Sequence, residues 1–398
     1  MTTKCEICER KNVPLLQDYL NPEVFYCFEC SQSENIFTPM TINQDKIEIV
    51  SPKDIKKRLD AVVIGQDYAK KVLATEVYKH YLRVNNRIDI ELSGRFFEKS
   101  NILLTGLSGT GKTLLAKTLA EIVDVPFTIG DATSLTEAGY VGEDVEHLIY
   151  GLLRASDDDV FKAERGIVYI DEIDKVAKKS ENLSITRDVS GEGVQQALLK
   201  LVEGHTIRVP KQGGRKHPQQ QMIEVNTQDI LFIAGGAFTG IEEIIEKRLK
   251  SANSGIGFNR TELPKETKNN YRSQITSEDL KSFGLIPEFL GRFSLTANLE
   301  PLTKEDLVLI LKESEKSVLK EYQLFFSLQN KLLTFEEDAL IFIAEYAIDK
   351  GTGARGLRAI LDEVMLDLSF ELPDLTDDNI IIDLEYVQSQ LNGSSQIA

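Results

Sequence analysis

The chain has 398 residues, of which 42% are hydrophobic and 27% are charged. This composition is typical of folded globular protein and excludes general disorder, and the length predicts two or three domains of about 150 residues each. Acidic residues outnumber basic ones by 63 to 46, and the resulting net charge of −17 disfavours nucleic acid as the main partner. The sequence has no apolar run long enough for a membrane span and no apolar signal core, so we expect a cytoplasmic protein with no membrane partner.

All four cysteines lie near the N-terminus, at Cys5, Cys8, Cys27 and Cys30. Two Cys-x2-Cys pairs predict a closed tetrahedral site for Zn²⁺, which a module of about 40 residues needs because its core is small. A pair of disulfides and a redox dithiol are the alternatives. A cytosolic compartment disfavours the disulfides, and a redox pair does not normally occur twice. We expect residues 1–45 to bind protein rather than to catalyse.

Residues 31–50 are polar and predict a linker. Ser51 and Pro52 then predict the start of a helix, and a second helical stretch is expected from Asp67 to Val84. Apolar runs that alternate with helical patterns follow, which predicts a parallel sheet with helices on both faces. These runs are 101–105, 125–129, 166–170 and 230–233.

From Thr303 onward the pattern is mainly helical, and Thr303 and Asp306 have the spacing of a capping box. We therefore expect an α/β domain over residues 51–300 and a smaller helical domain over residues 301–388. Residues 389–398 have the composition of a flexible tail.

The segment from Gly106 to Thr113 fits the pattern G-x-x-x-x-G-K-T, directly after an expected strand and before an expected helix. Glycines let backbone N–H groups converge on phosphate, Lys112 adds a positive charge, and the Thr113 hydroxyl can bind Mg²⁺. A glycine turn that happens to precede a helix is the alternative, and it requires neither the lysine nor the threonine. The segment therefore predicts a site for a nucleoside triphosphate such as ATP.

Asp171 and Glu172 follow the apolar run at 166–170. An aspartate at a strand end can hold magnesium through water, and the adjacent glutamate can deprotonate or orient an attacking water. The strand expected at 125–129 lies between the two motifs, an order seen in ATPases whose glutamate activates water, so hydrolysis is favoured over phosphoryl transfer to a substrate. Arg292 and Arg355 are either surface cations or the two arginines that an ATPase takes from a neighbouring subunit and from its own lid.

Together these motifs resemble the ClpX family of AAA+ ATPases, which unfold proteins for the ClpP peptidase. The resemblance runs from Cys5 to about Leu372. It rests on the zinc tetrad, the phosphate loop, Asp171-Glu172, and the segments Gly139–Gly142, Arg187–Gly193, Arg215–His217 and Gly353–Arg355.

The resemblance implies an AAA+ fold and a role for each matching residue. Val63 and Ile64 would border the adenine, and Gly106, Gly109, Gly111, Lys112, Thr113 and Asp171 would bind the phosphates and magnesium. Glu172 would be the catalytic base, Arg292 the finger that reaches the next subunit, and Arg355 the sensor of the small domain. The pore would be lined by Tyr140, Val141, the loop that begins at Arg187, and the triplet Arg215, Lys216 and His217. Ile256, Gly257 and Phe258 would dock on the peptidase.

One expected feature of AAA+ proteins has no counterpart in the sequence. The strand expected at 230–233 runs into Ala234, Gly235, Gly236 and Ala237, whereas many AAA+ proteins place a polar sensor at the end of their fourth strand. No residue is therefore assigned to that role.

The sequence favours a homohexameric ring that threads tagged or unfolded proteins, presented directly or by adaptors, into a ClpP-type peptidase. Tyr140 and Val141, flanked by glycines, would give the pore loop a flexible apolar tip that can press on any extended chain. An AAA+ nucleic-acid motor or loader is the alternative enzyme, and it would need basic pore residues. A zinc-dependent scaffold that only switches with nucleotide is a third possibility, disfavoured by the adjacent Asp171 and Glu172.

Overall fold

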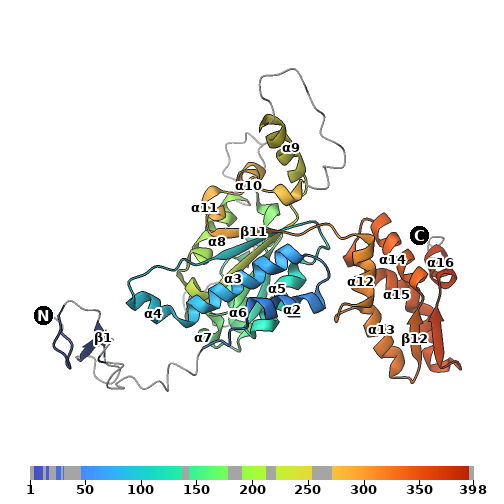
Figure 1. Cartoon of the computed structure of the whole chain (residues 1–398), viewed down its shortest axis with the longest axis horizontal. Helices are drawn as coiled ribbons and strands as arrows, with labels where there is room; N and C mark the ends of the chain where they lie inside the picture. Colours follow the sequence, from blue (N-terminus) through green and yellow to red (C-terminus); the bar gives the residue numbers. More distant parts are fainter. Residues whose placement is uncertain are drawn as a thin grey trace. The chain divides into compact units, whose positions relative to one another are not determined.

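In a computed structural model of the chain, the structure describes residues 4–11, 15–17, 24–27, 30, 46–136, 143–177, 191–211, 221–252 and 271–393 (Figure 1). It divides into two compact units. The first comprises Met1–Val50 with Val77–Lys99, and the second comprises Ser51–Glu76 with Ser100–Ala398. No helix in the described part of the chain has the length and hydrophobicity to span a bilayer.

The first unit contains the cysteine module and a helical part. In the module, β1 (Leu15–Gln17) and β2 (Phe25–Cys27) form an antiparallel pair. The helical part consists of the end of α3 (Asp67–Asn85) and all of α4 (Arg87–Leu92). The Asn85 side chain donates to Ile47 O at 2.8 Å and accepts from Ile47 N at 3.1 Å, so the end of the expected linker is held on α3.

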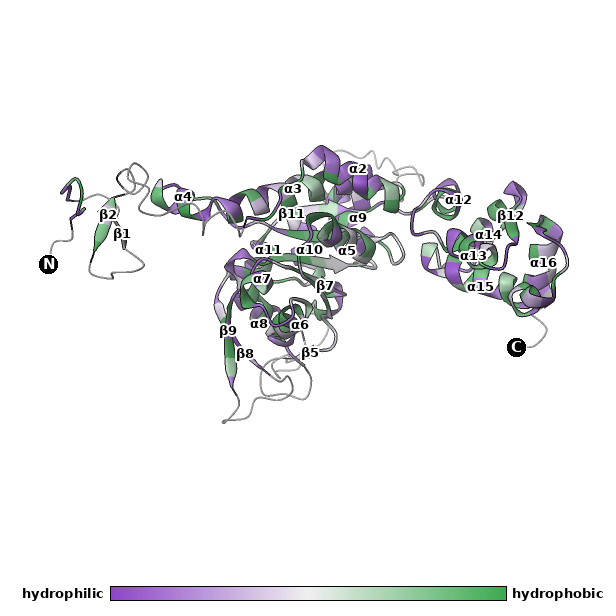
Figure 2. Ribbon diagram, turned by 90° about the horizontal axis from the view of Figure 1, so that it is seen from below, coloured by the Kyte–Doolittle hydropathy of each residue, from purple (hydrophilic) through white to green (hydrophobic). Residues whose placement is uncertain are grey.

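The second unit begins with α2 (Pro52–Val62), where the predicted cap is confirmed. Ser51 Oγ accepts a hydrogen bond from Asp54 N at 3.2 Å, and Pro52 occupies the first turn. Most residues of α2 are hydrophilic, as Figure 2 shows. Its apolar stripe of Ile55, Leu59 and Val62 is buried, which is the pattern of a helix packed on one side.

A parallel sheet lies in the α/β part of the second unit (Figure 1), as predicted. It has five strands, of which the edge strand at residues 293–298 was not predicted. The strand order is β11-β3-β10-β7-β4. Strand β10 therefore lies between β3, which leads into the phosphate loop, and β7, which ends at Asp171. The strands are β3 (Asn101–Thr105), β4 (Phe127–Asp131), β7 (Ile167–Asp171), β10 (Leu231–Gly236) and β11 (Phe293–Asn298).

Helices cover both faces of this sheet, which confirms the α/β class. Leu103, Val168 and Phe232 pack into a core with side chains of α6 (His147–Ala155) and α8 (Glu192–Glu203). Because side chains alternate along a strand, their neighbours point to the other face, where α5 (Lys112–Val123) packs on β7 and β10. The phosphate loop and the end of β7 thus share one end of the sheet.

The remaining elements of this domain surround the sheet. Strand β4 begins two residues later than the predicted run, because Pro126 has no N–H to donate to a strand partner. The antiparallel pair of β8 and β9 was not predicted. The elements are α7 (Val160–Ala163), α9 (Ile241–Ala252), α10 (Ser277–Phe283), α11 (Pro287–Leu290), β5 (Leu135–Thr136), β6 (Glu143–Asp144), β8 (Thr206–Pro210) and β9 (Met222–Asn226).

The C-terminal part is a helical domain with its own core, and the capping box of Thr303 and Asp306 is confirmed. The chain expected to be a tail from residue 389 is helical as far as Gly393, because Leu391 is buried beside Val387 in that core. The elements are α12 (Lys304–Lys312), α13 (Val318–Ser327), β12 (Leu332–Phe335), α14 (Glu337–Asp349), α15 (Ala354–Glu371), β13 (Asn379–Ile382) and α16 (Leu384–Gly393).

Candidate functional site

The phosphate loop joins β3 to α5, and its glycines are required by its shape. Gly109 has φ of 82° and Gly111 has φ of 97°, a region of backbone conformation that favours glycine. A Cβ atom on Gly106 would lie 2.8 Å from Leu299 Cβ, which leaves no space for a side chain. Gly106 therefore lets the loop lie against Leu299, and Gly109 and Gly111 allow its left-handed turns.

Lys112 is buried in the loop, with 8% of its surface exposed. Its Nζ donates to Gly106 O at 2.6 Å and to Leu107 O at 3.0 Å. Burial lowers the pKa of Lys112, and the charge of Asp171 opposes that shift. A phosphate oxygen is a stronger acceptor for an ammonium group than a neutral carbonyl. The lysine is therefore placed to exchange its carbonyl partners for a bound phosphate.

The Thr113 hydroxyl and the Asp171 carboxylate come together between α5 and β7. Thr113 Oγ1 donates to Asp171 Oδ2 at 3.1 Å. The other carboxylate oxygen accepts from the Tyr169 hydroxyl at 3.2 Å and from Glu172 N at 2.9 Å. Burial raises the pKa of Tyr169, so its hydroxyl remains a donor at neutral pH. Mg²⁺ prefers oxygen ligands and keeps several waters, so a hydroxyl beside one carboxylate fits this ion.

Glu172 lies next to this pair in an uncommon backbone conformation. Its φ is 55°, in the left-handed region, and its side chain is exposed. Such a conformation costs of order 1 kcal/mol in a residue other than glycine and occurs preferentially at functional sites. Because the Glu172 side chain is exposed, its carboxylate is accessible to a water molecule, as a general base requires.

A cavity of about 360 Å³ adjoins the phosphate loop. Val63 and Ile64 line it together with Gly109 and Gly111, so the structure brings these predicted residues to one place. Its other walls come from the helical domain and are largely apolar, as a flat aromatic base requires. The apolar lining residues of that domain are Leu302, Ile310, Leu311, Val318, Ala354 and Leu357.

Arg355 lines the same cavity from the first turn of α15. The backbone there approaches the phosphate loop closely. A Cβ atom on Gly109 would lie 3.5 Å from Thr352 O and 3.6 Å from Arg355 N. The helical domain therefore contributes both apolar surface and a cation to the site, which agrees with the placement expected for a lid arginine.

Sequence reasoning missed the residues that connect the segment at 61–66 to the helical domain. Gln66 is buried, and its amide donates to Glu300 O and accepts from Glu300 N, both at 2.8 Å. Ser314 Oγ donates to Val62 O at 2.8 Å, and Glu315 N donates to Ala61 O at 3.0 Å. In the sequence, Gln66 is only a polar residue before an expected helix. Its partner Glu300 is too distant in sequence for any local pattern to indicate the contact.

Arg292 lies at the other end of the sheet from its own phosphate loop. It immediately precedes β11, whose Phe293 pairs with Asn101 and whose Asn298 pairs with Thr105. The phosphate loop begins after Thr105, four strand steps or about 13 Å further along. Arg292 Nη2 instead forms an exposed ion pair with Glu203 at 2.6 Å. The structure therefore does not bring Arg292 to the site formed by Lys112 and Asp171.

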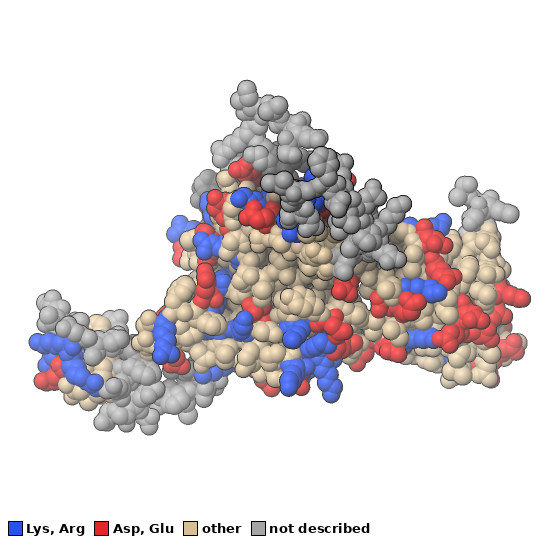
Figure 3. Space-filling model, turned by 45° about the horizontal axis from the view of Figure 1, so that its top comes forward, with Lys and Arg blue, Asp and Glu red and all other residues tan. Residues whose placement is uncertain are grey.

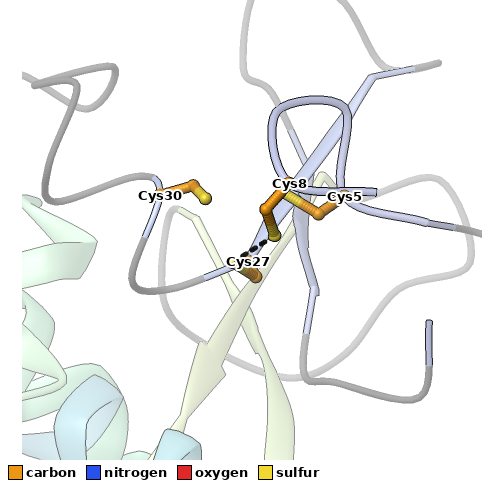
Figure 4. Close-up of side chains that lie close together, drawn as sticks. All are labelled: Cys5, Cys8, Cys27 and Cys30. Atoms are coloured by element: carbon orange, nitrogen blue, oxygen red, sulfur yellow. Dashed lines mark hydrogen bonds between the residues drawn. The ribbon is translucent and has the colours of Figure 1, made fainter. Parts of the chain in front are cut away.

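The four cysteines form a compact cluster in the N-terminal module (Figure 4). Their Sγ atoms all lie within 4.8 Å of one another, and Cys8 and Cys27 are 3.5 Å apart. Sulfur atoms around tetrahedral zinc, with Zn–S bonds of 2.3 Å, lie about 3.8 Å apart, so the cluster fits Zn²⁺. The backbone and side chain of Arg10 lower the pKa of Cys8, and its Nε donates to Cys8 Sγ at 3.2 Å. That bond favours the thiolate, which is the form that binds metal.

Several predicted residues lie outside the described part of the chain. They are Tyr140 and Val141 of the first pore loop, Arg187 of the second, the triplet Arg215, Lys216 and His217, and the docking tripeptide Ile256, Gly257 and Phe258. Of the second loop, residues 191–193 are described, and Glu192 and Gly193 begin α8. These assignments remain predictions.

Comparison with known proteins gives matches over most of the chain. The AAA domain (Cdc48 subfamily) matches residues 98–296, and the C-terminal, D2-small domain of ClpB protein matches residues 302–373. Two curated relatives come from Borrelia duttonii (strain Ly) and Borrelia recurrentis (strain A1). Both are named "ATP-dependent Clp protease ATP-binding subunit ClpX". Each is 50% identical over 375 residues, which cover 93% of this chain and 87% of the relative.

Proposed function

Because the chain belongs to the ClpX family of AAA+ ATPases, we propose that it unfolds protein substrates and passes them to a ClpP-type peptidase. The observation that carries this proposal is the identity of 50% over 93% of the chain, which extends well beyond the two matched ATPase domains. In a ClpX-type chain, ATP hydrolysis drives mechanical work on another polypeptide.

The chain is an ATPase, and its site supports a division of labour among the residues. We assign the adenine of the nucleotide to the cavity beside Val63 and Ile64, and its phosphates to the loop and Lys112. Thr113 and Asp171 would hold Mg²⁺, which supplies positive charge to the phosphate oxygens when it is bound. Glu172 would orient and deprotonate the attacking water, since its carboxylate is exposed beside Asp171.

The position of Arg292 supports assembly into a closed ring. An arginine finger must reach the terminal phosphate, and Arg292 is at the far end of the sheet from its own phosphate loop. It can therefore serve only a nucleotide held by a neighbouring subunit. Repetition of that contact around an axis gives a ring, for which we propose six copies.

Within the ring, nucleotide turnover would move the helical domain relative to the sheet domain. Arg355 and the apolar wall of the cavity belong to the helical domain, so their contacts change when nucleotide leaves. Tyr140 and Val141 would transmit this motion to an extended substrate. The substrate would first meet the pore at Arg187, Arg215, Lys216 and His217. Ile256, Gly257 and Phe258 would bind the peptidase.

The cysteine module would bind Zn²⁺ and recruit substrates or adaptors. Its four thiols fit zinc and leave no ligand position for a reacting water, which supports a structural metal. Nucleic acid is a poor alternative partner, because red acidic side chains outnumber blue basic ones on the face of the C-terminal helical domain that Figure 3 shows, and the net charge is −17.

The proposal is tested with a tagged, stably folded fluorescent protein as substrate. We expect its fluorescence to fall only with ATP present, and the released chain to be degraded only when ClpP is added. A variant with Tyr140→Ala should keep its ATPase but lose the fall in fluorescence. Undiminished unfolding by that variant would exclude Tyr140 as the gripping residue. If the protein hydrolyses ATP but never unfolds the tagged substrate, an unfoldase function would be excluded.

A further inference from the structure

The end of strand β10 faces the magnesium residues but has no side chain of its own there. Ala234 pairs with Ile170 on β7, and Gly235 pairs with Leu104 on β3. Gly235 is therefore level with Asp171 and lies between it and the strand that leads into the phosphate loop. Because this residue is glycine, β10 offers no polar side chain at this level.

The Tyr169 hydroxyl occupies the space above Gly235. A Cβ atom on Gly235 would lie 2.1 Å from Tyr169 Oη and 2.8 Å from its Cζ. Tyr169 is fully buried, so its ring has no alternative position in solvent. The glycine at 235 and the tyrosine at 169 thus form a matched pair, because only a residue without a side chain admits the hydroxyl at this place.

From that position the hydroxyl holds one oxygen of the Asp171 carboxylate. Tyr169 Oη donates to Oδ1 at 3.2 Å, while Thr113 Oγ1 donates to Oδ2 at 3.1 Å. Hydrogen bonds on both oxygens fix the plane of the carboxylate. Partners that orient a metal ligand in this way contribute to metal affinity although they do not touch the ion.

We infer that Tyr169 is a positioning residue of the ATPase site and supplies, from β7, the polar group that β10 lacks. It orients Asp171 toward Mg²⁺ and Thr113. This inference rests on ATP hydrolysis alone and does not depend on protein unfolding. If Tyr169 only filled the core, removal of its hydroxyl would change stability and leave the response to magnesium unaltered.

The test is the effect of Mg²⁺ on nucleotide binding in the full-length protein with Tyr169→Phe. The affinity for a fluorescent ADP is measured in EDTA and in excess magnesium, and the ratio of the two affinities is the readout. We expect the variant to lose about tenfold of the magnesium-dependent tightening, with affinity in EDTA unchanged. A wild-type ratio in the variant would overturn the inference.

Two further variants separate this role from packing. Tyr386→Phe removes a hydroxyl from a half-buried tyrosine of the helical domain and should leave the ratio unchanged. Gly235→Ala should lower the ratio as Tyr169→Phe does, because the new methyl group displaces the same hydroxyl. The double variant should then lose no more than either single variant, whereas losses that multiply would contradict a shared hydrogen bond. If Gly235→Ala does not fold, Tyr169→Phe alone decides.

Discussion

Among single residues, Glu172 combines an exposed carboxylate with a constrained backbone. With a φ of 55°, it turns the chain directly after β7, and its N–H donates a hydrogen bond to Asp171 Oδ1. The backbone of Glu172 therefore helps to hold Asp171, for which we propose the magnesium role, while its side chain is exposed. Backbone and side chain have separate functions, so the side chain can be changed alone.

For this reason Glu172→Gln is expected to abolish turnover and preserve nucleotide binding. Glutamine keeps the shape and the N–H but cannot accept a proton, so the ATPase rate should fall by about 10²- to 10⁴-fold. Phosphate release gives the rate, and a fluorescent ATP analogue gives the affinity. Glu243→Gln, at an exposed position of α9, is the control and should behave as wild type. Turnover retained in Glu172→Gln would remove this residue as the base.

At the same scale, the sequence predicts residues that belong to one contiguous motif and misses those assembled across strands. Gly106, Lys112 and Thr113 lie within eight positions, and each residue type has a specific chemical use there. Tyr169 has the pattern of a core residue, because a buried aromatic in an apolar run usually packs and does nothing else. Its hydroxyl acquires a role only because Gly235 on the neighbouring strand leaves the space open.

At the scale of elements, the start of α3 is attached by Gln66 to the segment that leads into the helical domain. Its amide makes two hydrogen bonds with the backbone of Glu300, in the chain that leads from β11 to α12. Val63 and Ile64 lie just before it and line the nucleotide cavity. The position of that cavity wall therefore depends on a buried side chain that does not itself line the cavity.

Gln66→Ala should consequently lower both stability and ATP affinity. Two hydrogen bonds with the backbone of Glu300 are lost, each worth about 0.5–1.5 kcal/mol, so we expect the free energy of unfolding to fall by about 1–3 kcal/mol. Urea denaturation followed by circular dichroism measures the stability, and titration with a fluorescent ATP analogue measures the affinity. Gln323→Ala removes one hydrogen bond to Leu333 O and should not alter the affinity. Equal affinities in the two variants would contradict the role of Gln66.

The cysteine module is an element whose fold should depend on its metal. All four cysteines of the chain belong to this cluster, so a thiol reagent reports on the module alone. We expect one Zn²⁺ per chain, slow thiol reaction before chelation, and fast reaction of all four thiols after it. The basal ATPase should survive, because no cysteine lines the nucleotide cavity. Fast reaction of the thiols in the untreated protein would argue against a bound metal.

Strands were predicted where apolar runs are continuous and missed where they are mixed. Strands β3, β7 and β10 are buried on both faces, so the middle of each strand is a continuous apolar run. Strand β11 at the edge of the sheet alternates buried Phe293 with exposed Ser294, and β12 and β13 each bury one face only. The location of Arg292 could not be predicted without β11, because its register with β3 sets the distance to the phosphate loop.

For the whole molecule, Arg292, the proposed finger, lies at the other end of the sheet from Lys112 of its own chain, so we propose that a complete active site needs two chains. Arg292→Ala should therefore reduce the ATPase by about 10³-fold or more while each subunit still binds nucleotide. Arg208→Ala is a suitable control, because Arg208 is also exposed and paired with a glutamate, Glu224, at 2.8 Å. An Arg292→Ala protein with full activity would exclude the finger.

Mixing two inactive variants tests the shared site directly. Arg292→Ala subunits retain Glu172, and Glu172→Gln subunits retain Arg292. A nucleotide bound by an Arg292→Ala subunit, next to a Glu172→Gln subunit that supplies its arginine, has both Glu172 and Arg292 at its site. An equal mixture that exchanges subunits should regain about a quarter of the wild-type ATPase if neighbours combine at random and sites fire independently. Fluorescence transfer between labelled subunits reports whether they exchange. If they exchange and no activity is regained, Arg292 does not act across the interface.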